Sequence, residues 1–320
     1  MNYTELLSFN LPEELPQGYC LHQLTGDAST RSYFRIKEPS GGTVILMKMP
    51  EPFNPNDFAY LRNYELFRSI GVQLAAILEM NPSRGFVLLN DLGDHTFHEL
   101  YPHWTERERF SNFFKALEYQ ALIEKAIPTD SLSFDIEKFT WELNYFLKHY
   151  LIAVGNADLS SDEREELNHH FGRLAGELAE RPRFFCHRDY HSRNFMVHNG
   201  CVYVIDFQDA RYGPATYDLA SLCYDSYIQH SPALIQHLEQ AFFIRHPNND
   251  TQRYEYPRMC LQRNLKALGT FGYQSTVMGR TFYLQFVPAT LEYVRNHFKR
   301  LPEYADLSKI LSRYLPELRP

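Results

Sequence analysis

The stretch from residue 184 to residue 210, FFCHRDYHSRNFMVHNGCVYVIDFQDA, constrains this chain more than any other. Within it, an Asn-Gly dipeptide separates two short apolar runs. Asn-Gly in such a setting is the strongest short-range signal for a β-hairpin with a two-residue turn. A hairpin returns its two ends to one place. The sequence therefore predicts that Asn194 and Asp206 lie close together, with Asp189 in the loop that precedes the hairpin.

The polar residues of this stretch have the spacing of a phosphoryl-transfer site. His-Arg-Asp is followed at a fixed offset by Asn194, and a second carboxylate follows the hairpin, as in the loop H-R-D-x-x-x-x-N with its metal-binding Asp. The carboxylate of Asp189 can hold an attacking hydroxyl and accept its proton. The amide oxygen of Asn194 and the carboxylate of Asp206 are oxygen ligands of the kind that Mg²⁺ prefers. We therefore predict Asp189 as the catalytic base and the other two residues as Mg²⁺ ligands.

Length and composition exclude several classes of protein. The chain has 320 residues, of which 44% are hydrophobic and 22% are charged. This is long enough for two lobes and has the composition of an ordinary folded protein rather than a disordered one. The net charge is −7, and the Lys and Arg residues form no cluster, which disfavours nucleic acid as a partner.

The cysteines and the apolar stretches indicate the compartment. The five cysteines are scattered and include no C-x-x-C pair, which favours a reducing compartment over a disulfide framework. The N-terminal residues lack the basic-then-apolar order of a secretory signal, and no apolar stretch approaches the ~18 residues that span a bilayer. We therefore expect a cytoplasmic protein that acts on a small molecule and does not associate with a membrane.

The N-terminal region resembles a nucleotide-binding sheet. Its pattern predicts strands at 20–24, 32–36 and 43–49, with a polar turn between the first two. In the small lobe of a kinase, such a turn covers the nucleotide phosphates and a lysine on the third strand reaches them. The sequence therefore predicts that this region binds a nucleotide.

Three residues of this region are candidate nucleotide contacts. The polar turn has a single glycine, so Ser29 and Thr30 would have to supply hydrogen-bond donors that glycine-rich loops supply from the backbone. Lys48, at the end of the third strand, is the candidate phosphate-binding lysine. The helix expected after it offers two acids that could pair with this lysine, Asp57 and Glu65, and the sequence does not decide between them.

The rest of the chain is predominantly helical in pattern. After an apolar run at 86–89 and a polar linker, apolar residues recur at helical spacing. Helices are expected at residues 105–126, 134–151, 161–180, 254–273 and 281–299. Asp218 is most simply the N-cap of a further helix. We predict an α+β, two-lobed protein-kinase-like fold with a small antiparallel-sheet lobe at 1–92, which binds nucleotide, and a mostly helical lobe at 93–320, which carries catalysis and substrate binding.

These motifs resemble the aminoglycoside phosphotransferase, or choline-kinase-like, superfamily of small-molecule kinases. Within it, GDASTRSYFRI, GFVLLNDLGD, HRDYHSRN with IDFQDARYGPATYDL, and LQRNLKALGTF are similar to the kinases that phosphorylate N-acetylmuramate and N-acetylglucosamine at C1 in bacterial cell-wall recycling. The resemblance implies ATP and Mg²⁺ as cofactors and an amino sugar as substrate. By position it implies Asp189 as base, Asn194 and Asp206 as metal ligands and Lys48 as the phosphate-contacting lysine. The metal motif Asp-Phe-Gln has no glycine after its Phe, and no A-P-E segment follows, which disfavours a protein kinase.

Three alternatives remain open. An aminoglycoside kinase would need carboxylates for a polycationic substrate, whereas residues 254–300 are rich in Arg and Lys and would sooner suit a substrate with a carboxylate. A metal-dependent hydrolase could use His187, Asp189 and His191 as zinc ligands, although Arg188 lies between them. An inactive kinase-like binding module is disfavoured because the predicted catalytic, metal-binding and lysine residues are all retained. We expect the helices after Tyr217 and around 262–271 to line the substrate site.

Overall fold

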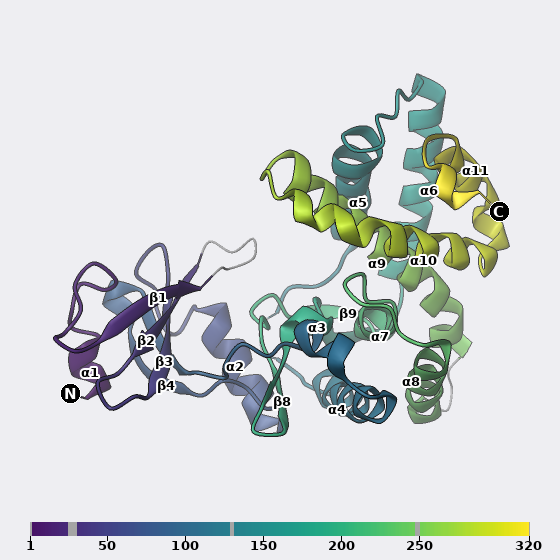
Figure 1. The fold of residues 1–320 in the computed structure, drawn as a ribbon. Coiled ribbons are helices and arrows are strands. Elements are labelled where there is room, and N and C mark those ends of the chain that lie inside the picture. Colours follow the sequence, from purple (N-terminus) through teal and green to yellow (C-terminus); the bar gives the residue numbers. More distant parts are fainter. Residues whose placement is uncertain (1, 25–30, 129–130, 247–249, 320) are drawn as a thin grey trace. The chain divides into compact units, whose positions relative to one another are not determined.

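The computed structural model describes residues 2–24, 31–128, 131–246 and 250–319 (Figure 1). The chain divides into two compact units. The first unit contains Met1–Thr96 and Phe195–Asp209, and the second contains Phe97–Asn194 and Ala210–Pro320. The predicted division at residue 92 therefore differs from these units in one main respect: the hairpin segment, which we placed in the second lobe, groups with the first unit.

The first unit is built on a five-stranded antiparallel sheet in the order β1-β2-β3-β5-β4. Its elements are α1 (Tyr3–Leu6), β1 (Cys20–Leu24), β2 (Ser32–Lys37), β3 (Thr43–Lys48), α2 (Ala59–Ser69), β4 (Ile77–Asn81), a 3₁₀ turn (Pro82–Arg84), β5 (Phe86–Asn90), β7 (Phe195–His198) and β8 (Cys201–Val204). The three strands predicted from the N-terminal pattern correspond to β1, β2 and β3. The region 25–30, which contains Ser29 and Thr30, lies outside the described residues.

One face of this sheet is an apolar core closed by the N-terminal segment. Successive residues of a strand point to opposite faces, and directly paired residues of neighbouring strands share a face. Val44 and Leu46 of β3 belong to a buried cluster with Leu11 and with Phe86 of β5. Lys48 is paired with Phe86 and is two residues beyond Leu46, so its side chain leaves the sheet on this same core face.

The other face of the sheet carries Tyr33 and Met47, which are paired across β2 and β3. Arg35, two residues after Tyr33, also belongs to this face. Its guanidinium forms an ion pair with Asp91 at 2.5 Å, just after β5, and with Asp94 at 2.8 Å. The linker that follows the sheet is therefore fixed to β2 by charge.

The predicted hairpin is confirmed. β7 pairs with β8 from Phe195 opposite Val204 to the turn at Asn199 and Gly200. Both turn residues have positive φ, 50° and 73°, which is the geometry of the two-residue turn that Asn-Gly favours. The hairpin joins the first unit through backbone bonds: the N–H of Val204 donates to the carbonyl of Gln73 at 2.9 Å.

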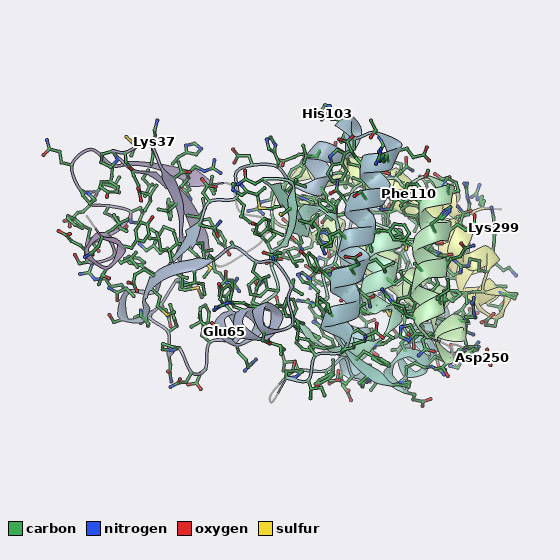
Figure 2. The ribbon with its side chains drawn as sticks, turned by 90° about the horizontal axis from the view of Figure 1, so that it is seen from below. Lys37, Glu65, His103, Phe110, Asp250 and Lys299 are labelled. Atoms are coloured by element: carbon green, nitrogen blue, oxygen red, sulfur yellow. The ribbon has the colours of Figure 1, made fainter. Side chains whose placement is uncertain are left out.

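The second unit is mainly helical, as predicted, and the two units together give the α+β class. Its elements are α3 (Phe97–Leu100), a 3₁₀ turn (Tyr101–His103), α4 (Glu106–Glu124), α5 (Ile136–Phe146), a π-helical turn (Leu147–Ile152), α6 (Ser161–Ala179), β6 (Arg183–Cys186), a 3₁₀ turn (Ser192–Asn194), β9 (Arg211–Pro214), α7 (Thr216–Cys223), α8 (Pro232–Arg245), α9 (Asp250–Thr276), a 3₁₀ helix (Thr281–Phe286), α10 (Val287–Lys299), a 3₁₀ turn (Pro302–Tyr304), α11 (Ala305–Tyr314) and a 3₁₀ turn (Pro316–Leu318). Figure 2 marks the start of α9 at Asp250 and the end of α10 at Lys299.

Helix α9 is the longest helix of the described residues and packs against α5, α7 and α10 (Figure 1). Two glycines allow the approach to α5 and the π-helical turn that follows it. A Cβ at Gly272 would lie 2.0 Å from the carbonyl oxygen of His149, and a Cβ at Gly269 would lie 2.8 Å from the backbone of Phe146. Only glycine permits this contact, so α9 is held against the end of α5.

One predicted helix has a different extent. The pattern at 281–299 indicates one helix, whereas the structure begins with a 3₁₀ helix and starts α10 at Val287. Pro288 explains the break because proline has no N–H to donate and fits the first turn of an α-helix.

Candidate active site

The predicted catalytic loop lies in the second unit, between β6 and the 3₁₀ turn that ends at Asn194. β6 pairs with β9, so the strand that enters the loop is fixed at its end. Arg188, the second residue of the loop, has φ of 85°, a conformation that side chains other than glycine rarely adopt. Such backbone strain persists where surrounding contacts enforce it, and it concentrates at functional sites.

Asp218 supplies the contact that enforces this turn. Its carboxylate accepts the backbone N–H of His187 at 2.6 Å and that of Arg188 at 3.0 Å. The side chain is buried, and burial raises the pKa of Asp218 to about 7, against which the two N–H donors act. The interpretation of Asp218 as a helix N-cap was wrong. It is the third residue of α7, and it binds a loop distant in sequence instead of its own helix.

A second buried carboxylate fixes the far end of the loop. Asp225 accepts the N–H of Ser192 at 2.6 Å and that of Tyr227 at 2.8 Å. Between the two carboxylates, the hydroxyl of Tyr190 donates to the carbonyl of Ala116 in α4 at 2.7 Å. The loop that carries Asp189 is therefore held by side chains on both sides of the catalytic residue, and neither carboxylate was predicted from the sequence.

Asp218→Asn is expected to lower kcat by about 10- to 100-fold. A hydrogen bond to a charged acceptor is worth about 1.5–3 kcal/mol, and in this variant one of the two N–H groups, of His187 or Arg188, would lose its acceptor. We expect the Kd for nucleotide to change much less. Steady-state kinetics with calorimetric nucleotide binding would measure both quantities. Asp306→Asn, an exposed residue of α11, is the matched control. A variant that loses nucleotide binding as much as kcat would show that Asp218 supports the fold in general and not the loop.

Asp189 itself is surrounded by cations. Its Oδ1 lies 2.8 Å from Nζ of Lys266 and 3.8 Å from the guanidinium of Arg263, and its Oδ2 lies 3.9 Å from that of Arg188. Burial by itself raises the pKa of this carboxyl, but the three cations together lower the pKa of Asp189 well below its ordinary value. Asp189 is therefore ionised at neutral pH, ready to accept a hydrogen bond from a hydroxyl.

The two cations on α9 differ in how they are held. Arg263 donates to the hydroxyls of Ser221 at 2.8 Å and Tyr217 at 3.1 Å, so α7 fixes it. Lys266 is partly buried, and this loss of solvent lowers its pKa, whereas Asp189 opposes the shift. Residues three apart share one face of a helix, and this spacing in the sequence could have indicated a common acidic partner. The expected site-lining helix around 262–271 does reach Asp189.

Asn194 lies on the same loop as Asp189. Its side-chain nitrogen donates to the backbone carbonyl of Asp189 at 2.8 Å, and its backbone N–H donates to the carbonyl of His191. This assigns the amide nitrogen to the loop, so the amide oxygen is the atom that could act as a metal ligand. The geometry fits the oxygen chemistry of Mg²⁺.

Asp206 belongs to the first unit, just beyond β8, and has φ of 63°. Gln208 donates its side-chain amide to Oδ1 of Asp206 at 2.7 Å. The next residue, Phe207, is buried with its ring 4.9 Å from Tyr60 and 5.7 Å from Phe67 of α2. Helix α2 thus fixes the segment that carries the predicted metal ligand.

Helix α2 contributes an amide to this segment, whereas we expected the helix to contribute an acid to Lys48. Asn63 is buried, and its side-chain nitrogen donates to the carbonyls of Phe207 and Gln208, both at 3.0 Å. Glu65, labelled in Figure 2, is exposed and lies 3.7 Å from Arg68, and Asp57 accepts a bond from Asn54. The link between α2 and the metal-ligand segment is therefore made by hydrogen bonds and aromatic packing.

Lys48 has partners that the sequence did not indicate. Its Nζ lies 3.2 Å from the carbonyl oxygen of Leu11 and 3.4 Å from the carboxylate of Glu13. Both partners belong to the N-terminal segment that covers the core face of the sheet. The acid paired with Lys48 is thus Glu13, and neither of the two acids predicted near α2 takes this place.

The histidines proposed as zinc ligands belong to the loop itself, where His187 is buried and His191 is partly buried. Burial lowers the pKa of His191 to about 3, and its ring packs against Tyr227 with centroids 4.9 Å apart. Throughout the ranges that the structure describes, no group of three or more His, Cys, Asp and Glu side chains is arranged to hold a metal ion. The hydrolase alternative gains no support from this arrangement.

An antiparallel sheet unit and a helical unit carrying an H-R-D-x-x-x-x-N loop define a kinase-like phosphotransferase. The family model described as "Phosphotransferase enzyme family" matches residues 21–257. The chain belongs to this family. In its described part, no helix has the length and apolarity needed to cross a membrane.

Curated relatives extend the similarity over most of the chain. An N-acetylmuramate/N-acetylglucosamine kinase of Neisseria meningitidis serogroup B is 30% identical over 299 residues, covering 89% of this chain and 87% of the relative. A protein of the same name from Pseudomonas aeruginosa is 29% identical over 300 residues, covering 90% and 86%. These relatives agree with the resemblance that the sequence motifs indicated.

Solved structures confirm the fold. An ADP-bound aminoglycoside phosphotransferase superposes with a TM-score of 0.56 at 15% identity, covering 87% of this chain and 94% of its own. A choline/ethanolamine kinase family protein from Mesorhizobium loti gives a TM-score of 0.56 at 16% identity, covering 99% and 97%. At such identities, the similarity shows the protein-kinase-like fold alone.

Proposed function

We propose that this protein transfers the γ-phosphoryl group of ATP to the C1 hydroxyl of N-acetylmuramate or N-acetylglucosamine. The observation that carries the proposal is the ionised, partly buried Asp189, fixed on a loop with the spacing of phosphoryl-transfer enzymes. The names of the curated relatives support the choice of sugar. An ATP-consuming reaction with a free sugar is also consistent with the expected cytoplasmic location.

In this mechanism Asp189 orients the C1 hydroxyl toward the γ-phosphorus. A bond forms between the C1 oxygen and the γ-phosphorus while the bond from that phosphorus to the bridging β–γ oxygen breaks, leaving ADP. The hydroxyl proton passes to the carboxylate of Asp189. Because the pKa of this carboxyl is low, orientation is its main contribution and proton transfer comes late, as fits a loose transition state.

The metal-binding and nucleotide-binding roles are part of the proposal. Asn194, through its amide oxygen, and Asp206, through its carboxylate, would hold Mg²⁺, and their positions on either side of the hairpin in the sequence support this pairing. When bound, Mg²⁺ supplies positive charge that offsets the charge of the nucleotide phosphates. Ser29 and Thr30 remain predicted nucleotide contacts. The role predicted for Lys48 would require its ammonium to leave Leu11 and Glu13.

The rival substrate class, an aminoglycoside, is disfavoured by charge. A polycation would have to approach Asp189 beside Lys266, Arg263 and Arg188, whose charged nitrogens lie within 2.8 to 3.9 Å of its carboxylate. A polycation bound beside these side chains would be repelled by their like charge. A neutral or anionic sugar meets no such repulsion.

The test is ATP consumption with Mg²⁺ over a panel of N-acetylmuramate, N-acetylglucosamine, kanamycin, choline and homoserine, with Asp189→Asn as the blank. We expect turnover on the N-acetyl sugars alone, and an acid-labile sugar phosphate, as expected for phosphate at C1. A product that resists mild acid would place the phosphate on another hydroxyl. Turnover on kanamycin alone would refute the choice of sugar and assign the protein to the antibiotic-modifying kinases.

A further inference from the structure

Two cationic side chains, Arg31 and Lys48, lie at the same end of the sheet of the first unit. Only Arg31 contacts helix α2. Lys48 is the last residue of β3 and is paired with Ser32, the first residue of β2. Arg31 directly precedes Ser32. Since side chains alternate along a strand, Arg31 and Lys48 are expected on opposite faces.

Contacts confirm that Arg31 is on the face opposite the N-terminal segment. Its guanidinium carbon lies 5.8 Å from the ring centroid of Tyr60 in α2. The ring of Tyr60 in turn lies 4.9 Å from that of Phe207, the residue after Asp206. Arg31 therefore contacts Tyr60, and Tyr60 contacts Phe207 in the segment of the proposed metal ligand. All of these residues belong to the first unit.

The electrostatics of this face agree with the contacts. Burial raises the pKa of Tyr33, while Arg31 lowers it and Asp206 raises it. For Tyr60 too, Arg31 lowers the pKa and Asp206 raises it. One guanidinium and the proposed metal-binding carboxylate thus influence the same two tyrosines, whereas Lys48 forms its contacts with Leu11 and Glu13 on the other face.

We propose that Arg31, and not Lys48, is the cationic side chain of the first unit that contacts the nucleotide phosphates. The inference rests on the proposed ATP-dependent function. The guanidinium of Arg31 would then contact the phosphates, which is the role that the position of Lys48 predicted for its ammonium. A guanidinium presents a fork of donors that matches two phosphate oxygens at once, so Arg31 can bind the phosphates without the lysine–acid pair that α2 lacks.

Calorimetric titration of the full-length protein with MgATP and with adenosine tests the assignment. Arg31→Met is expected to raise the Kd for MgATP by about 10- to 100-fold, the effect of losing a charge-assisted contact, and to leave the Kd for adenosine within about threefold. Lys48→Met is expected to raise the Kd for MgATP by less than Arg31→Met. Lys37→Met, at the exposed end of β2 and labelled in Figure 2, is the matched control.

The outcomes separate the inference from the proposed function. Failure of the unmodified protein to bind MgATP would refute the ATP-dependent function itself. If the unmodified protein binds MgATP and Lys48→Met is the more damaging variant, the assignment to Arg31 is wrong. Equal losses of MgATP and adenosine binding in Arg31→Met would also overturn it, because a phosphate contact cannot affect a ligand that has no phosphate.

Discussion

Asp189→Asn is expected to lower kcat for sugar phosphorylation by about 10²–10⁴-fold, the usual contribution of a positioned acid–base group, while MgATP still binds. The amide keeps the size of the side chain but removes the charge that holds the hydroxyl and accepts its proton. It also leaves Lys266 at 2.8 Å without its anionic partner. Single-turnover kinetics together with nucleotide titration would separate the chemical step from binding. Turnover near that of the unmodified protein would remove Asp189 from the mechanism.

The pH profile provides an independent measurement of the same residue. Asp189 acts as the ionised carboxylate, so activity is present above its pKa and is lost as the pH falls through it. Because Lys266, Arg188 and Arg263 lower this pKa well below the ordinary value, the acid limb of kcat/KM is expected below the range where an unperturbed Asp titrates. Lys266→Met removes one of the three cations and is expected to move the acid limb to higher pH. An unchanged limb in this variant would show that another group determines it.

Asp206→Ala is expected to abolish the part of ATP binding that depends on Mg²⁺. Alanine supplies no oxygen ligand, and the charge of the triphosphate would then lack the metal that offsets it. Calorimetry with and without Mg²⁺ should give a large difference in Kd for the unmodified protein and little or none for the variant.

Asp209→Ala, a carboxylate three residues further along the chain, controls for the loss of negative charge alone. A Mg²⁺ dependence in Asp206→Ala equal to that of the unmodified protein would exclude Asp206 as a ligand. Adenosine affinity should not change in either variant.

The features of this protein that depend on local chemistry could be predicted from the residues alone. Asn199-Gly200 predicted a hairpin because few other dipeptides adopt positive φ at two successive positions, and the hairpin formed with that turn. The order of residues around Asp189 predicted the kind of site because oxygen ligands and a carboxylate base are required by the reaction itself. The three N-terminal strands followed from their alternating and turn-flanked patterns.

Which side chains contact one another depends on packing between segments that are far apart in the sequence. Asp218 looked like a helix cap in sequence because capping is the local use of Asp, but burial against a distant loop gave it the two N–H groups of His187 and Arg188. Lys266 contacts Asp189 at 2.8 Å although the two residues are 77 positions apart in the sequence, so no local pattern could pair them. The partners of Lys48 were not predictable for the same reason. A strand pattern predicts that successive side chains point to opposite faces of the sheet, but which face the N-terminal segment covers depends on the packing of residues far apart in the chain.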